Sequence, residues 1–152
     1  MNYWLFKTEP SECSIDDFAH NPTQAIVWEG VRNYQARNYL RDDVAIGDQV
    51  LIYHSSCKLI GVAGIAEVVR AAYADPSQFD SRSVYYDAKS IAAQPRWVAV
   101  DLRFVSKLPA VITLDKIKSS AKMAELPLVQ KGSRLSVMPV TAQQWRDLLA
   151  LQ

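Results

Sequence analysis

The chain has 152 residues, a length that suits one hydrophobic core, and we expect residues 1–152 to form a single domain. Hydrophobic residues make up 49% of it and charged residues 22%, which is ordinary for a globular protein in water. The net charge is only +1, from 17 Lys and Arg against 16 Asp and Glu. That balance argues against a protein held on nucleic acid mainly by neutralising phosphates, although a local basic patch remains compatible with it.

Cysteine and histidine patterns give no sign of a metal centre. The two cysteines, Cys13 and Cys57, form no C-x-x-C motif and no cluster with zinc spacing, so we expect two reduced thiols and no metal or cofactor. The chain begins on a strand-like segment without a signal-peptide pattern, and no apolar run approaches the roughly 18 residues of a membrane helix. These features predict a soluble, cytoplasmic protein.

In the first half of the chain, apolar runs alternate with helix caps. Ser14 and Asp17 have the spacing of a capping box, so a short helix should begin there. Gly30 permits a sharp turn before a weakly amphipathic helix whose inward face we expect to carry Val31, Tyr34 and Leu40. The predicted elements, in order, are a strand at 3–7, a helix after Ser14, a strand at 26–28, a helix at 31–41 and a strand at 49–54.

The second half begins with a partner strand at 60–69, which should form a hairpin with 49–54. Gly61 and Gly64 within it predict a bulge, a barrel corner or a close backbone contact. Residues 75–95 are polar and rich in turn formers, and we expect a surface excursion with at most one turn of helix. The remaining predictions are a strand at 97–105 broken by Pro109, short helices near 113–117 and 120–126, a strand ended by Pro139, and a last helix capped by Thr141 and Gln144.

These elements predict an α+β fold. Five or six mostly antiparallel strands, joined by hairpins and interrupted by glycines, favour a small closed or half-closed barrel with short helices packed outside. No βαβ rhythm or internal repeat is present.

The sequence lacks the motifs of the common enzyme classes. No nucleophile elbow, phosphate-binding loop, dinucleotide fingerprint or zinc-deaminase signature occurs. His54 beside Cys57, or Glu29 as a general base, leaves an enzyme acting on a small planar substrate as an alternative hypothesis.

A binding site is indicated by residues 28–38, where a tryptophan precedes a glycine and then arginines, asparagines and a tyrosine. Planar bases stack on aromatic rings and are read at their edges by hydroxyl, amide and backbone groups. On this composition alone Trp28 is more often a core residue than a site residue, and Trp4, Trp97 and Trp145 are predicted to belong to the core. The candidate base-binding residues are Trp28, Asn33, Thr8, Lys7, Ser55, Tyr53 and Ser133, and the candidate phosphate contacts are Arg32, Arg37 and Arg134.

Several blocks together resemble the EVE domain family across nearly the whole chain. They are residues 3–10 (YWLFKTEP), 28–38 (WEGVRNYQARN), 50–55 (VLIYHS), 61–68 (GVAGIAEV) and 132–137 (GSRLSV). The resemblance implies a PUA-like β-pseudobarrel and kinship with YTH domains, which bind a methylated adenine in an aromatic cage. Lys7 and Thr8 resemble the positions after the first strand, Trp28 the first cage tryptophan, and Ser55 the loop that supplies a further wall.

Two departures from the family pattern matter. Thr8 stands where the first block usually has a serine, which keeps the hydroxyl, and residues 57–60 offer no second tryptophan. The resemblance implies a non-catalytic module that reads a modified nucleobase in DNA or RNA. A general RNA-binding accessory module is the further alternative. On the first hypothesis we expect Trp28→Ala to abolish base-selective binding while the fold survives.

Overall fold

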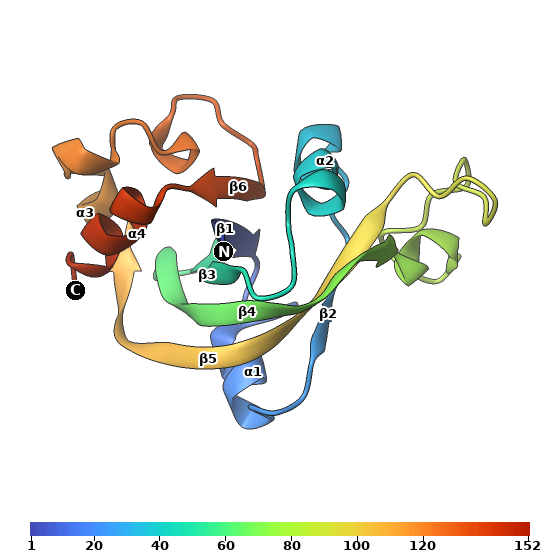
Figure 1. Ribbon diagram of the computed structural model, residues 1–152, viewed down its shortest axis with the longest axis horizontal. Coiled ribbons are helices and arrows are strands. Elements are labelled where there is room, and N and C mark those ends of the chain that lie inside the picture. The colour runs from blue at the N-terminus through green and yellow to red at the C-terminus, as the bar shows by residue number, and fades with distance from the viewer.

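A computed structural model of residues 1–152 shows one six-stranded sheet with short helices around it (Figure 1). The strands follow one another across the sheet in the order β2-β5-β4-β3-β1-β6. Their bounds are β1 Tyr3–Thr8, β2 Ile26–Trp28, β3 Gln49–His54, β4 Gly61–Ala74, β5 Val98–Thr113 and β6 Val137–Val140. The helices are α1 Ile15–His20, α2 Tyr34–Asp42, α3 Leu114–Lys118 and α4 Ala142–Leu149, with 3-10 turns at Pro76–Phe79, Ala121–Met123 and Pro127–Val129.

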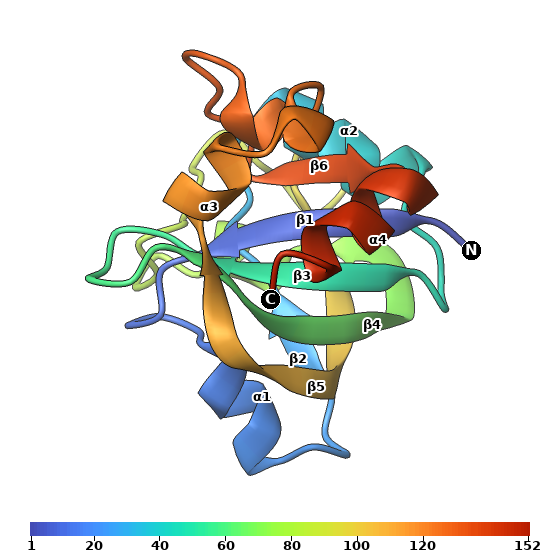
Figure 2. The same ribbon diagram turned by 90° about the vertical axis from the view of Figure 1, so that its left-hand side faces the viewer.

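The sheet is mixed but mostly antiparallel. Its one parallel pair joins β1 to β3, with Trp4 opposite Val50, and every other pair is antiparallel. Figure 2 shows β6, β1, β3, β4 and β5 lying one after another. The sheet ends at β2 and β6, which are not paired to each other, so it stays open although it bends strongly. The predicted α+β class is thereby confirmed.

The bend comes from the long pair β4 and β5, whose register shifts at four places. The predicted hairpin of β3 and β4 is confirmed, and both glycines of β4 lie where a side chain would collide. A Cβ on Gly61 would meet the carbonyl of Ile112, and a Cβ on Gly64 would meet the side chain of Ile15. Gly64 thus lets α1 pack directly on the sheet, which places the loop between β1 and α1 beside β2.

Both predicted capping boxes are confirmed. Ser14 and Asp17 bond reciprocally at the start of α1, and Thr141 and Gln144 do so at the start of α4. The fixed start of α1 matters for the site because the residues just before it form one wall of the main cavity.

Several boundaries differ from the expectations. The helix predicted from residue 31 begins at Tyr34, because the Asn33 side chain accepts the backbone N–H of Ala36 and so caps it there. Tyr34 therefore lies at the first helical position, 52% exposed, instead of facing inward. Pro109 does not end its strand, since β5 continues to Thr113, and Pro139 lies inside β6. Neither proline interrupts the sheet: Pro109 lies at a register shift where no residue of β4 pairs with it, and Pro139 lies in the edge strand β6.

A core of 31 buried residues fills the space between the sheet and its helices. Trp4 and Trp97 are buried as predicted, and Trp145 packs partly buried against the core. Trp28 is also buried, with 6% of its surface exposed. No helix is long and apolar enough to cross a membrane.

Candidate functional site

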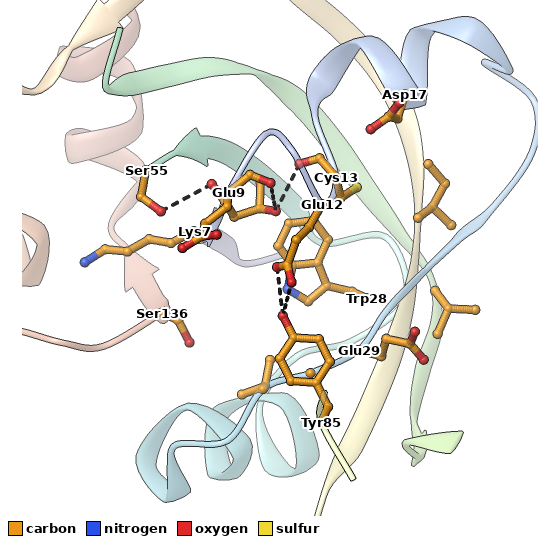
Figure 3. A pocket seen from close by; sticks show the side chains of 15 residues that line it. Lys7, Glu9, Glu12, Cys13, Asp17, Trp28, Glu29, Ser55, Tyr85 and Ser136 are labelled. Carbon is orange, nitrogen blue, oxygen red and sulfur yellow. Dashed lines mark hydrogen bonds between the residues drawn. The ribbon is translucent and has the colours of Figure 1, made fainter. Parts of the chain in front are cut away.

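The main cavity of the molecule, about 690 Å³ in volume, opens between β1, β2 and the start of α1 (Figure 3). Its volume lies within the range of roughly 300–1,000 Å³ that is typical of small-molecule sites. The chain brings five separate segments to it: the end of β1 with the following loop and the start of α1, β2 with the three residues after it, Ser55 after β3, Tyr85 of the 75–97 segment, and Ser136 just before β6. The lining residues are Lys7, Thr8, Glu9, Glu12, Cys13, Asp17, Ile26, Val27, Trp28, Glu29, Gly30, Val31, Ser55, Tyr85 and Ser136.

Trp28 forms the inner wall of this cavity. Its ring packs on the core, with Phe6 at a centroid distance of 5.5 Å and Phe18 stacked at 6.4 Å. The indole N–H of Trp4 donates to Asp48 and that of Trp97 donates to Asp87, but no protein acceptor takes the N–H of Trp28. Every side-chain nitrogen or oxygen that is fully buried has a hydrogen-bond partner. Because the Trp28 nitrogen has none, it must be accessible to solvent. Trp28 thus offers the cavity an unused hydrogen-bond donor.

The loop between β1 and α1 is held by hydroxyl and imidazole groups. The Thr8 hydroxyl donates to the carbonyl of Cys13 at 3.0 Å, and Ser55 bonds the carbonyl of Thr8 through both its N–H and its hydroxyl. Nε2 of His54 accepts the backbone N–H of Ile15 at 3.1 Å. Burial, the larger influence, lowers the pKa of His54, which agrees with a neutral ring that accepts this bond. These contacts fix the wall of the cavity.

Tyr85 crosses the mouth of the cavity. Its hydroxyl donates to the Glu12 carboxylate, whose two oxygens lie 2.6 and 2.7 Å away, and Figure 3 shows the two side chains meeting. Burial and the bond to Glu12 raise the pKa of Tyr85 to about 12. The ring lies flat on Gly30, where a Cβ would come within 2.7 Å of it, and Gly30 has a φ of +84°. Glycine is needed here for both the backbone conformation and the close approach of the ring.

A buried polar cluster behind Tyr85 holds the 75–97 segment, and we call it the Asp75 hub. The Asp75 carboxylate is fully buried and accepts bonds from the N–H of Gly30, the guanidinium of Arg32, and the N–H and hydroxyl of Ser77. Burial alone would raise the pKa of Asp75, but these bonds outweigh burial and hold it below its usual value. Gln78 bonds the carbonyls of Asp75 and Trp97 and accepts from Ser90, Arg96 and Trp97. The predicted surface excursion is therefore anchored from inside.

The charge in the cavity is mostly negative. Four acidic residues line it and Lys7 is its one cation. Asp17 is committed to the cap of α1, whereas burial, then the charge of Asp75, raises the pKa of Glu29. Burial lowers the pKa of Lys7, whose ammonium lies 5.9 Å from the centre of the Tyr53 ring. An interior of this charge disfavours phosphate and suits groups that donate hydrogen bonds.

The structure brings together only some of the candidate site residues. Lys7, Thr8, Trp28 and Ser55 line one cavity. Tyr53 is buried behind Lys7, while Asn33 is the cap of α2, and neither lines the cavity; Ser133 lies outside it as well.

The three candidate phosphate contacts also differ in their surroundings. Arg32 is taken up by the Asp75 hub and bonds the carbonyl of Tyr85 twice, at 2.7 and 3.1 Å. Arg37 lies over Tyr34 and donates to the carbonyl of Arg96. Arg134 is exposed. The Arg37 guanidinium also donates twice to the side chain of Asn38, so it is partly engaged, whereas the Arg134 guanidinium has no partner in the protein. Arg32 positions Tyr85.

Sequence reasoning missed Glu12 and Tyr85, which are 73 positions apart in the chain. No local pattern connects them, because the contact depends on the path of the 75–97 segment. The available signals were weak: Gly30 indicated a sharp turn of the backbone, and two tyrosines followed by an aspartate stand at 85–87 in an otherwise polar segment.

Comparison with known proteins places this arrangement in a family. Residues 2–151 match the EVE domain family. Thymocyte nuclear protein 1 of Gallus gallus is 36% identical over 99% of this chain and 68% of its own length. A crystal structure of a Pseudomonas putida protein is 52% identical, covers 98% of each chain and has a TM-score of 0.94. The human THYN1 protein, solved in complex with 5-methylcytosine-containing DNA, is 34% identical over 99% of this chain and 97% of its own, with a TM-score of 0.92. The chain therefore belongs to the EVE domain family.

Proposed function

We propose that this protein is a non-catalytic module that binds nucleic acid carrying a modified base and holds that base, out of the stack, in the cavity at Trp28. The observation that carries the proposal is the unused indole N–H of a tryptophan that is otherwise buried at the inner wall of a base-sized cavity. The human relative, whose fold is shared over nearly the whole chain, was solved with 5-methylcytosine-containing DNA, which supports DNA as the polymer.

The energetics of such binding are reasonable. Extruding a base costs a few kcal/mol. Because the Trp28 ring packs on Phe6 and Phe18 and is only 6% exposed, the compensating energy would come mainly from hydrogen bonds to the edge of the base, about 0.5–1.5 kcal/mol each, and not from stacking on Trp28. Phosphates would be met outside the acidic cavity, by Arg37 and Arg134. Thr8 and Ser55 would act mainly by shaping the wall, since their hydroxyls already donate to backbone carbonyls.

Of the two candidate general bases of the enzyme alternative, Glu29 lines the cavity and burial raises its pKa, whereas His54 does not line the cavity. His54 already accepts the N–H of Ile15. Burial, aided by Asp17 and Glu12, raises the pKa of Cys13 to about 11, so its thiol is a poor nucleophile near neutral pH. The cytoplasmic location expected from the sequence stays a prediction.

The test is equilibrium binding to oligonucleotides that differ at one base, with wild type and Trp28→Phe. Trp28→Ala would mix a loss of binding with a loss of fold, because Trp28 stacks on the core and its truncation would cost about 3–5 kcal/mol of stability. Phenylalanine keeps the ring contacts and removes the N–H, so we expect affinity for the modified oligonucleotide to fall about tenfold, the effect of losing one buried hydrogen bond.

Trp145→Phe is the matched control, since Trp145 lies on α4 against Tyr3 and does not line the cavity. Equal affinity of the wild type for modified and unmodified DNA would rule the proposal out. Tighter binding of structured RNA than of modified DNA would instead favour the general RNA-binding module.

A further inference from the structure

The acceptors of the cavity indicate which bases it takes. A base is recognised at its edge by donors and acceptors, and carboxylates read exocyclic amino groups because they accept hydrogen bonds but donate none when ionised. This cavity holds several carboxylates and, on its inner wall, the unpartnered indole N–H of Trp28, a residue that is only 6% exposed. An amino group beside a ring nitrogen, as in cytosine or adenine, is the complementary edge.

Among the carboxylates, Glu12 is the one held in a fixed position toward the cavity. Asp17 is used in the cap of α1, and neither Glu9 nor Glu29 has a side-chain partner in the protein. The Tyr85 hydroxyl donates to the Glu12 carboxylate across the mouth, while Arg32 bonds the backbone carbonyl of Tyr85 and Gly30 supports its ring. Figure 3 shows the nitrogen edge of Trp28 turned toward the side where Glu12 and Tyr85 meet.

We propose that the Glu12 carboxylate, positioned by Tyr85, selects bases that carry an exocyclic amino group and rejects bases with a carbonyl oxygen at that position. A carboxylate has about four acceptor sites, so Glu12 can keep the bond from Tyr85 and accept an amino group as well. A carbonyl oxygen at the same place would face the carboxylate with no proton between them. The inference rests on the proposed function and narrows it to amino bases.

The chemical contrast is sharpest between 5-methylcytosine and thymine. Both carry the methyl group, and they differ at the edge that the cavity would read: 5-methylcytosine has an amino group beside a ring nitrogen without a hydrogen, whereas thymine has a carbonyl oxygen beside a ring N–H. Any preference between them therefore cannot come from a pocket for the methyl group. We expect the wild type to bind a 5-methylcytosine oligonucleotide at least tenfold tighter than the same oligonucleotide with thymine at that position.

Variants separate the roles of the two residues. In Glu12→Gln the amide can turn either its oxygen or its NH₂ to the base, so the preference should fall to within about twofold. In Tyr85→Phe the carboxylate remains but loses its orientation, so the preference should fall by a smaller factor. Glu125→Gln, an exposed residue that does not line the cavity, should leave the preference unchanged.

The measurements distinguish a failure of the amino-group inference from a failure of the proposed function. If the wild type binds 5-methylcytosine more tightly than cytosine, but binds thymine with the same affinity as 5-methylcytosine, the amino-group inference fails and the proposed function stands. If Glu12→Gln keeps the full preference, Glu12 is not the selecting acceptor. If wild type does not separate 5-methylcytosine from cytosine, 5-methylcytosine is not the base it reads; equal binding of every modified and unmodified base would remove the proposed function and this inference together.

Discussion

The Asp75 hub and the cavity meet at Gly30, and they differ in whether their polar side chains have partners within the protein. In the Asp75 hub, every side-chain donor and acceptor is paired, and the N–H of Trp97 beside it donates to Asp87. In the cavity, the N–H of Trp28 has no protein partner and two of the lining carboxylates, Glu9 and Glu29, have none either. Both tryptophans have the same exposed fraction, 6%, so burial alone does not tell them apart.

The difference shows which groups build the site and which remain free for a ligand. A buried, fully satisfied network gives rigidity because breaking any bond leaves a charge or dipole unpaired. An accessible unpaired donor on a rigid wall is free to bind something else. The hub holds Tyr85 in place, and Tyr85 in turn orients the Glu12 carboxylate at the cavity.

The largest expected effect comes from breaking the hub. Arg32→Met leaves the buried Asp75 carboxylate without its counter-ion, and we expect a loss of about 3 kcal/mol in the free energy of unfolding, the lower end for one partner of a buried ion pair. Chemical denaturation measures it. The control Arg82→Met removes an exposed ion pair with Asp80 and should change stability by less than about 1 kcal/mol. Similar losses in the two variants would show that the hub is not a stabilising unit.

A smaller effect on stability, with a specific effect on binding, is expected at Gly30. Gly30→Ala and Gly47→Ala both place a Cβ at a positive φ, so each should lose about 1–2 kcal/mol. Only Gly30→Ala also pushes the Tyr85 ring, since nothing lies within 4 Å of a Cβ at Gly47. We therefore expect weaker base selectivity in Gly30→Ala alone, measured with the same oligonucleotides. Unchanged selectivity in Gly30→Ala would contradict a positioning role for Tyr85.

The smallest effect is a pH dependence at the mouth of the cavity. The pKa of Tyr85 is about 12 in the fold, above the value of about 10 for an unfolded tyrosine. Its contribution to stability is thus complete below about pH 10 and is lost as the pH rises through the folded pKa. The stability difference between wild type and Tyr85→Phe should shrink over that interval. Tyr86→Phe, on the same segment and 45% exposed, should show no such change relative to wild type.

Much of the fold could be predicted from the sequence because its signals are local. Capping boxes at Ser14 and Thr141, the hairpin of β3 and β4, and the two glycines of β4 depend on neighbours in the chain. The start of α2 differs from the prediction because Asn33, which we expected to contact the base, caps the helix instead. The site was predictable only in part, since Trp28 and Lys7 belong to contiguous motifs, whereas Glu12 and Tyr85 meet only in the folded chain.

The most direct test of the central claim is nuclear magnetic resonance of the four indole N–H groups as an oligonucleotide with a flipped-out modified base is added. We predict that the Trp28 resonance shifts in proportion to binding, because its N–H gains an acceptor. The resonances of Trp4 and Trp97, bonded to Asp48 and Asp87, and that of the remote Trp145 should stay in place. Saturating binding with an unmoved Trp28 resonance would contradict the account.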